Sequence, residues 1–426
     1  MIVSYLYRKK TRADYLLRVE ISFHRLGLAA ILLVVNRGLQ GETRMNIAVI
    51  GAGLMGRAAV YDLSRAEGVG QIGVFDIDRQ LAVEMAEKYG GERAIAGEFD
   101  AGDEKRVAAV LGDYDAAISC VTYKYNPGLT RAAIVAGCHL VDLGGNVDIV
   151  RNQLRMNDDA QRAEVVIIPD CGLAPGMVSI LAADGMKRFD KVNSLRIRVG
   201  GLPQSPRPPL NYQMVFSAEG LINEYWEPCI ILENGKKKTV NPMTAVEVLE
   251  FDGIGELEAF YTSGGTSTLP DTYEGKIDFL DYKTIRYPGH CRLFKAMLEI
   301  GLGSRKKIEV DGQTIEPRSV FKAVLDRNLS FGDPDLVLVR MNFEGEKDGQ
   351  HKTVTYEIVD RQDNKAGLTA MMRMTAFPAS IIAWMAASGQ IAERGCKPQE
   401  VAVNPSLFIP QLKKRGIKLV IREQET

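Results

Sequence analysis

The stretch Asn46-Ile47-Ala48-Val49-Ile50-Gly51-Ala52-Gly53-Leu54-Met55-Gly56 decides the fold of this chain. Its apolar first half predicts a buried strand, and its three glycines predict a tight turn that opens a helix. The first glycine permits the turn, the second lets phosphates approach the backbone, and the third lets helix and strand pack closely. Because a helix N-terminus attracts anions, we expect a dinucleotide pyrophosphate here. The expected contacts are Gly51, Gly53, Leu54, Met55 and Gly56.

A second strand is predicted over residues 71–75 and ends in Asp76. This acid follows the last glycine of the turn by about twenty residues, the spacing of a dinucleotide-binding domain. A carboxylate at this position accepts hydrogen bonds from the ribose hydroxyls and repels a 2′-phosphate, so it favours NAD over NADP. Arg79 is either a ligand for such a phosphate or a solvated arginine at the start of the next helix, and we favour the second interpretation.

Composition sets the class of protein and its partners. The 426 residues are 46% hydrophobic, enough for sizeable cores and two or three domains. Lys plus Arg number 53 against 54 Asp plus Glu, so charge gives no reason to expect nucleic acid or an anionic membrane as a partner. Six widely spaced cysteines without a CxxC pair, and only four histidines, favour neither a metal site nor a disulfide framework. We therefore expect a cytoplasmic protein with a small-molecule substrate.

Residues 1–44 precede the first recognisable strand. An apolar run of ten, Leu26 to Val35, follows several basic residues there. It is too short to span a bilayer, and no A-x-A-like cleavage site comes after it. We expect Met45 to be the natural start and residues 1–44 to be an N-terminal extension outside the fold.

From Met45 to about Asp170, short apolar runs alternate with helical stretches, the pattern of a doubly wound parallel sheet. The texture changes after Pro175, where residues 195–199 alternate as a strand and a Pro/Gly-rich loop follows over 200–210. The predicted strands cover 46–50, 71–75, 94–96, 116–120, 139–142, 165–168, 195–199, 335–343 and 353–359, and the predicted helices cover 57–65, 79–89, 104–111 and 127–136.

These patterns predict an α/β protein of two domains. A Rossmann domain over 45–175 is followed by a C-terminal α/β domain over 176–368 with a mixed or antiparallel sheet, one face of which is free to pair with a second subunit. The apolar helical stretch 369–386 opens a final segment, 369–426, that we expect to pack back on the first domain.

In open α/β sheets the ligand lies beyond the carboxyl ends of the strands. After the fourth strand, Cys120 and Val121 are expected to border the cofactor and Tyr123 the reaction site, although Cys120 is more simply a small core residue. After the fifth strand, Leu143 and Gly144 let the backbone approach the nicotinamide, and Asp142 projects towards a substrate. After the sixth, Asp170 either contacts substrate or caps the next helix.

The second domain contributes the segment Tyr282-Lys283-Thr284-Ile285-Arg286-Tyr287-Pro288-Gly289-His290. Arg286 offers the planar fork that suits a carboxylate, and Thr284 and Tyr287 are expected to add hydrogen bonds around it. His290 is either a proton carrier or a structural donor. The hydroxyl-rich turn at 260–268 either closes over a ligand or is a hairpin loop.

At these residues the sequence resembles the saccharopine dehydrogenase-like family. The matching segments are GAGLMG at 51–56, VDLGG at 141–145, IPDCGLAPGM at 168–177, EAFYTSGGTSTL at 258–269 and YKTIRYPGH at 282–290. The resemblance implies a Rossmann domain, a C-terminal substrate domain and a homo-oligomer. Within the family, the similarity favours members that oxidise the ε-amine of L-lysine with NAD, releasing ammonia and an aldehyde that cyclises.

That chemistry needs an acid near the nicotinamide and a group that removes a proton, because a lysine ε-ammonium has a free pKa of about 10.4. Asp142 and Asp170 are the candidates to hold the ammonium, Tyr123 and His290 to relay the proton, and Arg286 to hold the α-carboxylate. Three alternatives stay open: a saccharopine dehydrogenase, which needs more basic residues, a member that reduces a carboxylated polyamine with NADPH, and a non-catalytic NAD-binding sensor.

Overall fold

The computed structural model describes residues 44–425, which form one compact unit. The expectation that the N-terminal extension is not part of the fold concerns residues that lie outside this range, apart from Arg44. The described part of the chain contains two large sheets, and each is treated in turn below.

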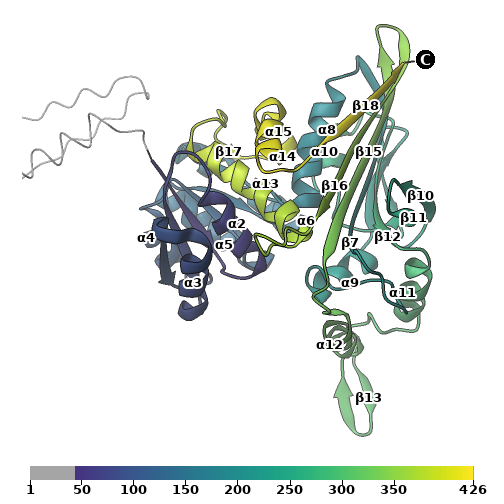
Figure 1. Cartoon of the computed structure of the whole chain (residues 1–426), viewed down its shortest axis with the longest axis horizontal. Helices are drawn as coiled ribbons and strands as arrows, with labels where there is room; N and C mark the ends of the chain where they lie inside the picture. The colour runs from purple at the N-terminus through teal and green to yellow at the C-terminus, as the bar shows by residue number, and fades with distance from the viewer. Residues whose placement is uncertain (1–43, 426) are drawn as a thin grey trace, which may run out of the picture. The chain divides into compact units, whose positions relative to one another are not determined.

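Within residues 44–425, the first sheet has seven strands, all parallel, in the order β17-β6-β5-β4-β1-β2-β3. Most of this sheet belongs to the purple and blue part of the ribbon in Figure 1. The strands are β1 (Met45–Ile50), β2 (Val69–Asp76), β3 (Ala94–Glu98), β4 (Ala116–Ser119), β5 (His139–Asp142), β6 (Val166–Ile168) and β17 (Gly395–Cys396). The order of β3 to β6 is that of a Rossmann sheet, which confirms the predicted fold class. The sequence analysis missed β17, a two-residue strand that the C-terminal segment adds at the edge.

Helices connect these strands, and the apolar spacing predicted the first four of them. They are α2 (Leu54–Leu63), α3 (Arg79–Met85), α4 (Glu104–Leu111) and α5 (Asn126–Ala136), and the structure adds α6 (Val147–Leu154) and α7 (Asn157–Arg162), which were not predicted. Residues on both faces of the sheet are fully buried, for example Val49 on one side and Ile50 on the other. Burial on both faces explains why the strands read as continuous apolar runs.

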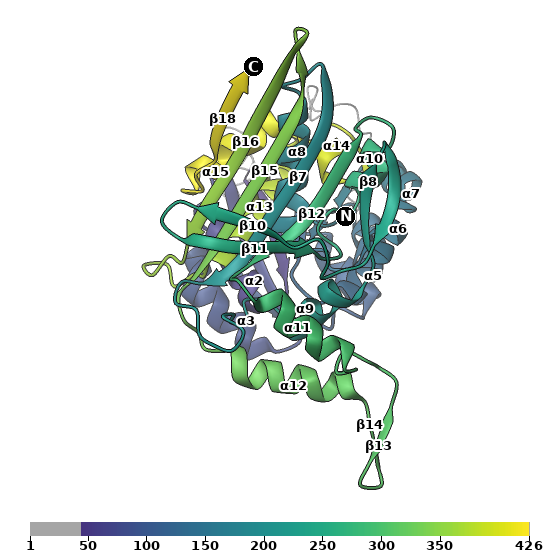
Figure 2. The same ribbon diagram turned by 90° about the vertical axis from the view of Figure 1, so that its right-hand side faces the viewer.

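The second sheet is mixed, as predicted. In the described part of the chain its main order is β10-β11-β12-β7-β15-β16-β18, with β8 and β9 attached to β12 (Figure 2). Only the β7–β12 pair is parallel among these described pairings. The strands are β7 (Lys191–Pro203), β8 (Cys229–Glu233), β9 (Lys236–Val240), β10 (Glu247–Phe251), β11 (Gly255–Tyr261), β12 (Phe279–Arg286), β15 (Asp335–Lys347), β16 (Gln350–Arg361) and β18 (Val420–Glu425).

Strand β7 runs through Pro203, so the first residues of the expected 200–210 loop are strand instead, paired with β15. Extended pairing with a neighbouring strand overrides the local Gly and Pro signal there. The remaining elements are α8 (Val178–Met186), α9 (Ala218–Trp226), α10 (Leu269–Tyr273), α11 (His290–Glu299), α12 (Pro317–Leu329), α14 (Gln399–Ala402), α15 (Pro405–Lys414) and the hairpin of β13 (Ile308–Val310) and β14 (Gln313–Ile315).

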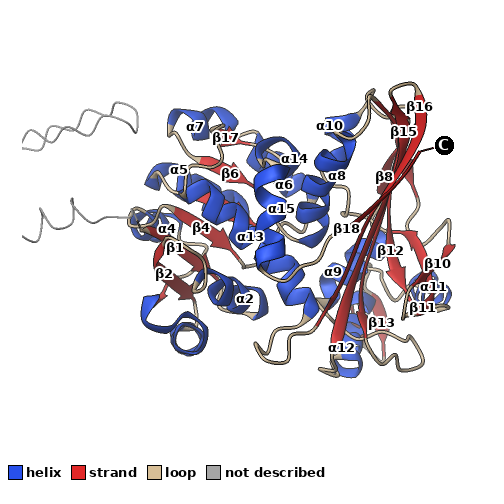
Figure 3. Ribbon diagram, turned by 45° about the horizontal axis from the view of Figure 1, so that its top comes forward, coloured by secondary structure: helices blue, strands red, loops and turns tan. Residues whose placement is uncertain are grey.

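One apolar helix joins the two sheets. Helix α13 (Ala370–Ala387) packs against α2, β4 and β5 on one side and against β15 and β16 on the other (Figure 3). It is long and apolar enough to cross a membrane, yet 89% of it is buried inside the protein, as expected of a core helix. Val49 of β1, Ile197 of β7 and Ile381 of α13 belong to one continuous hydrophobic cluster. The two sheets therefore share a core, while the exact domain boundary at residue 175 and the homo-oligomer stay predictions.

Candidate functional site

The glycine turn between β1 and α2 has the geometry that a bound pyrophosphate requires. Gly51 has a φ of 100°, and a Cβ on Gly56 would lie 1.8 Å from the Gly51 carbonyl oxygen, so both positions need glycine. A Cβ on Gly53 would instead meet no atom within 4 Å. That open space lies at the N-terminus of α2, where Leu54 is 53% exposed, so the turn leaves room for an anion.

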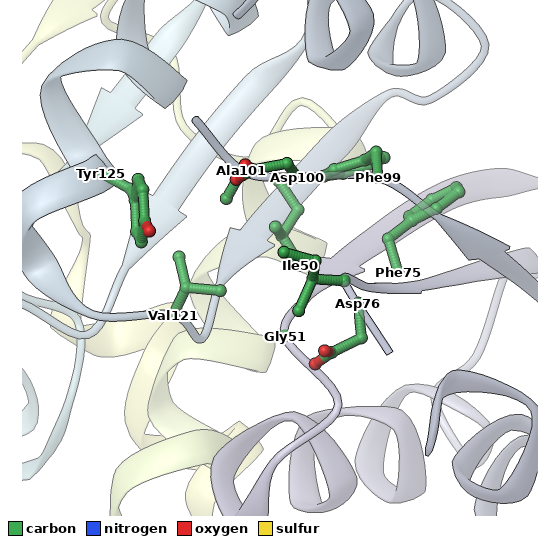
Figure 4. A pocket seen from close by; sticks show the side chains of 10 residues that line it. Ile50, Gly51, Phe75, Asp76, Phe99, Asp100, Ala101, Val121 and Tyr125 are labelled. Atoms are coloured by element: carbon green, nitrogen blue, oxygen red, sulfur yellow. The ribbon is translucent and has the colours of Figure 1, made fainter. Parts of the chain in front are cut away.

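Asp76 stands at the end of β2 and holds the turn in place. Its Oδ2 accepts a hydrogen bond from the Ala52 N–H at 2.7 Å, and its Oδ1 accepts one from the Asp78 N–H at 3.0 Å. Asp76 also lines an open pocket, together with Asp100 and several apolar side chains (Figure 4). Arg79 is the exposed first residue of α3, the interpretation favoured from the sequence.

The walls of this pocket suit an adenosine. They comprise Ile50, Gly51, Phe75, Asp76, Ile77, Phe99, Asp100, Ala101, Val121 and Tyr125. The Cys120 N–H donates to the Ile50 carbonyl at 2.7 Å, and burial raises the pKa of the Cys120 thiol to about 12, so it stays protonated near neutral pH. The open turn, the apolar walls and the carboxylate together fit a pyridine dinucleotide, with Val121 on the wall where the sequence analysis placed it.

Asp142 is buried and fully engaged by its own chain. Its Oδ1 accepts the N–H groups of Gly144 at 2.7 Å and Asp170 at 3.2 Å, and its Oδ2 accepts the amide of Gln153 at 2.7 Å. Asp142 therefore shapes the loop after β5, and its placement gives no support to a direct contact with substrate. Leu143 is half-buried in the same loop.

Asp170 differs from Asp142 because one of its carboxylate oxygens has no hydrogen-bond partner in the described part of the chain. It is 2% exposed, and its Oδ2 accepts the Ser267 hydroxyl. Its Oδ1 is buried and meets no hydrogen-bond partner among residues 44–425, although the nearby Gly145 N–H acts to lower the pKa of the carboxyl. A Cβ on Gly144 would lie 1.6 Å from this Oδ1, so the oxygen lies against the turn expected to border the nicotinamide. Burial raises the pKa of Asp170 to about 7, and the charge of Asp142 adds to the rise.

The backbone of Asp170 is held in a conformation that side chains seldom adopt. Its φ is 60°, and its carbonyl accepts the Gln399 amide of α14 at 2.6 Å. The helical segment that follows is capped at Gly172 with no side-chain hydrogen bond, so Asp170 is not the helix cap considered from the sequence. A carboxylate held in a sparsely populated conformation by a distant helix is typical of a functional position.

The loop at 262–268 connects Asp170 to the second sheet. Besides the Ser267 contact with Asp170, the Thr262 and Thr284 hydroxyls lie 2.6 Å apart, and the Ser263 N–H donates to the Glu224 carbonyl of α9 at 2.9 Å. The loop therefore touches both halves of the candidate site, which supports the first of the two interpretations of this turn.

Strand β12 divides the predicted substrate segment between two faces of the second sheet. Thr284 and Arg286 are two residues apart on the strand and therefore lie on the same face, which is the face that carries the 262–268 loop. Lys283 points to the other face, where its ammonium bonds to Glu247 at 2.7 Å. Tyr287 follows the strand, packs with a cluster on that other face, and donates its hydroxyl to the Pro203 carbonyl at 2.9 Å. Its placement gives no support to a substrate contact.

Arg286 is oriented by a chain of buried hydrogen bonds. Its Nε donates to the Tyr225 hydroxyl at 2.7 Å, and that hydroxyl lies 3.2 Å from His290 Nε2. His290 Nδ1 lies 3.0 Å from the Leu210 carbonyl, which only accepts, so Nδ1 carries the proton and Nε2 accepts from Tyr225. Burial, then the charge of Arg286, lowers the pKa of His290 to about 3. The ring is thus neutral and structural, the second interpretation given for it.

Two further groups surround Arg286 that the sequence analysis did not find. Its guanidinium stacks 4.8 Å from the centre of the Tyr212 ring, and Glu224 of α9 interacts with it electrostatically. The Glu224 carboxylate and the Arg286 Nη2 have no hydrogen-bond partner among the described residues. The only sequence feature that pointed to Glu224 is that it is an acidic residue in a short amphipathic helix.

Tyr123 lies against the loop after β5, where a Cβ on Gly145 would come within 2.7 Å of its ring.

Relatives by sequence are enzymes of amino-acid and polyamine metabolism. The chain is 24% identical over 267 residues to a saccharopine dehydrogenase [NADP(+), L-glutamate-forming] of Saccharomyces cerevisiae, which covers 60% of this chain and 58% of that protein. It is 24% identical over 290 residues to a carboxynorspermidine synthase of Vibrio cholerae, 64% of this chain and 66% of that protein. The match to the rat α-aminoadipic semialdehyde synthase covers 29% of that longer protein.

Solved structures show the same fold. The apo saccharopine dehydrogenase (L-Glu forming) from Saccharomyces cerevisiae superimposes with a TM-score of 0.75 at 19% identity, over 89% of this chain and 100% of that chain. A homospermidine synthase from Legionella pneumophila in complex with NAD gives a TM-score of 0.61 at 12% identity, over 90% and 93%. At these identities the likeness is evidence for the fold alone.

Two family models cover the chain. One described as the saccharopine dehydrogenase NADP binding domain matches residues 47–168. Another described as the saccharopine dehydrogenase C-terminal domain matches residues 172–417, more than half of the sequence. The protein therefore belongs to the saccharopine dehydrogenase family.

Proposed function

We propose that this protein is an L-lysine 6-dehydrogenase, which oxidises the ε-amine of L-lysine with NAD and releases ammonia and an aldehyde that cyclises. The observation that carries the proposal is that the 262–268 loop connects the Asp170 carboxylate with the strand that holds the Arg286 guanidinium. Ser267 contacts Asp170, and Thr262 contacts Thr284 on that strand. Within residues 44–425, Asp170 has an oxygen without a hydrogen-bond partner that is available to an amine, and Arg286 has an Nη2 without a partner that is available to a carboxylate. Lysine carries these two groups at opposite ends.

In this proposal Asp170 removes a proton from the ε-ammonium, because only the neutral amine has the lone pair needed to form a carbon–nitrogen double bond. A carboxyl whose pKa lies near 7 is well matched to that task near neutral pH. The pyridine nucleotide, when bound, supplies the acceptor for a hydride from the ε-carbon. Water then adds to the substrate imine, and ammonia leaves as the carbon–nitrogen bond breaks.

Arg286 fixes the distance between the reacting carbon and the cofactor by holding the α-carboxylate. The Tyr225 and His290 contacts prevent the guanidinium from rotating, so less conformational freedom is lost when substrate binds. Saccharopine carries three carboxylates, yet Lys283, the other cation expected beside Arg286, lies on the opposite face of the sheet. This placement favours lysine over saccharopine.

NAD is the proposed cofactor, although the family model bears the name of NADP and the yeast relative uses it. Both acids of the adenosine pocket, Asp76 and Asp100, lie where a 2′-phosphate would add negative charge. Arg79 is exposed at the start of α3 and has no contact among the described residues that would aim it at the pocket.

The test is formation of NADH at 340 nm when purified protein is mixed with NAD and either L-lysine or saccharopine, with ammonia measured in parallel. We expect absorbance to grow with L-lysine and to be matched by ammonia. Growth with saccharopine alone would assign the activity of the yeast relative instead. Absence of turnover with both substrates would overturn the proposed oxidation and favour the polyamine or sensor alternatives.

A further inference from the structure

The surroundings of Arg286 contain an acid that the proposed chemistry does not use. Glu224 lies on α9, next to Tyr225, whose hydroxyl accepts from Arg286 Nε at 2.7 Å. The carboxylate forms neither a hydrogen bond nor an ion pair with any described residue, and the Glu224 backbone is fixed by the Ser263 N–H at 2.9 Å. A half-buried carboxylate without a partner costs free energy that a cationic ligand would recover.

The electrostatics of Glu224 agree with a missing partner. Burial raises the pKa of Glu224 to about 7, even though the charge of Arg286 acts in the opposite direction. The charge of Arg286 therefore reaches Glu224, yet no ion pair joins the two side chains in the described part of the chain. The pair presents one positive and one negative group, both with free hydrogen-bonding capacity, at one end of the candidate site.

We propose that Glu224 and Arg286 together form a subsite for a zwitterionic α-amino acid head group, in which Arg286 binds the α-carboxylate and Glu224 binds the α-ammonium. Tyr212 forms the wall behind the guanidinium, whose carbon lies 4.8 Å from the ring centre. This inference rests on the proposed function, because it makes the α-amino acid end of the substrate the end remote from the cofactor. It makes Glu224 a specificity-determining residue that separates amino acids from plain amines and plain carboxylates.

The carboxylate and the ammonium of such a head group lie on adjacent carbon atoms, so a ligand that carries both can pair with Arg286 and Glu224 at the same time. A substrate with only a carboxylate would satisfy Arg286 and leave the half-buried Glu224 carboxylate without a cationic partner. A polyamine would satisfy Glu224 and leave the guanidinium unpaired, with a similar penalty. A site that leaves one buried charge unpaired rejects a ligand more strongly than one that merely loses an attraction.

The experiment measures binding without turnover. L-Norleucine carries the α-amino acid head group of lysine and no ε-amine, and hexanoate carries the carboxylate alone. Calorimetric titration of the NAD-loaded protein is expected to show L-norleucine binding at least about tenfold more tightly than hexanoate, a ratio worth about 1.4 kcal/mol. In Glu224→Gln this ratio is expected to fall to about twofold or less, because L-norleucine loses the partner of its ammonium, whereas hexanoate no longer leaves a carboxylate unpaired and binds at least as tightly as to the wild type.

Glu227→Gln is the matched control, because Glu227 is a half-buried acid three residues further on with no assigned role at the site. It should keep the wild-type ratio. Glu224→Asp should recover part of the preference, which a purely structural role would not produce. Hexanoate binding in Glu224→Gln that is at least as tight as in the wild type shows that the variant is folded with a working Arg286.

Equal affinity of the wild-type protein for the two ligands, or a preference that survives Glu224→Gln, would overturn the subsite. Its failure is distinct from failure of the proposed function. A protein that oxidises L-lysine but shows no norleucine preference keeps the function and loses the subsite. A protein that shows the preference but oxidises no lysine keeps the subsite and loses the function.

Discussion

The cofactor half and the substrate half of this site are built in opposite ways. Most of the cofactor half comes from one continuous segment, residues 46–76, in which strand, glycine turn, helix and acid follow one another, and residues 99–101, Val121 and Tyr125 complete the pocket. The substrate half is assembled from α9, the 262–268 loop, β12 and the start of α11, and Asp170 is held by Gln399 of the C-terminal segment. Local sequence therefore specifies where the nucleotide lies, whereas tertiary packing specifies what is oxidised.

The largest expected effect concerns the residue where the two halves meet. Asp170→Asn removes the proposed proton acceptor while keeping the shape of the side chain, and asparagine tolerates the positive φ of this position. We expect kcat for L-lysine to fall by about 10²-fold or more, with NAD binding unchanged. Steady-state rates and NAD titration measure this. A variant with nearly wild-type kcat would show that the base lies elsewhere.

The second prediction concerns the substrate half alone. Arg286→Ala is expected to raise KM for L-lysine by roughly ten- to hundredfold, since a charge-assisted hydrogen bond contributes about 1.5–3 kcal/mol. The KM for NAD should stay near the wild-type value. Tyr287→Phe is the control from the same segment, because its hydroxyl bonds only to the Pro203 carbonyl on the other face. Equal changes in both KM values would contradict the carboxylate role.

The third prediction concerns the cofactor half alone. Gly53→Ala adds a methyl group in open space, so the protein should fold normally yet bind NAD about tenfold more weakly. Gly56→Ala instead places a Cβ 1.8 Å from the Gly51 oxygen and should lower the melting temperature. Fluorescence titration and thermal unfolding separate the two effects. Wild-type NAD affinity in Gly53→Ala would remove the pyrophosphate from this turn.

The smallest expected effect is a shift along the pH axis. If Asp170 acts as its carboxylate, activity falls as pH drops through a pKa near 7. The Ser267 hydroxyl donates to this carboxylate and lowers its pKa, so Ser267→Ala should move the acidic limb of log kcat to higher pH. The plateau at alkaline pH should change little. A limb that stays in place would separate Asp170 from the observed titration.

Sequence patterns predicted the fold class, the Rossmann sheet apart from β17, and all of the cofactor turn, because strand periodicity and glycine chemistry are local. In the second sheet they predicted only parts of β7, β15 and β16. They predicted less of the substrate half. Side chains alternate between the two faces of a strand, so Thr284 and Arg286 lie on one face and Lys283 on the other once residues 279–286 are assigned as a strand. The sequence pattern alone did not identify this strand, and Thr284, Arg286 and Tyr287 were therefore expected on one side. Asp142 had the right position for a catalytic acid, yet Gln153 and two backbone N–H groups engage it.

Glu224 and Tyr225 could not be predicted from the sequence. Their roles depend on how α9 packs against β12, a contact between segments about sixty residues apart in the chain, as the separation of Tyr225 and Arg286 shows. Likewise, the chain segment that fixes Asp170 comes from α14, 229 residues further on. Such contacts follow from the shared core, which no local pattern reports.

The orientation of the substrate is the central claim, and deuterium transfer tests it most directly. L-Lysine labelled with deuterium at C6 and, separately, at C2 is oxidised with NAD, and the reduced nucleotide is analysed by mass spectrometry. The account predicts that deuterium reaches the nucleotide from C6 and not from C2, because Arg286 and Glu224 hold the α-end away from the cofactor. Transfer from C2 would place the α-carbon at Asp170 and contradict the account.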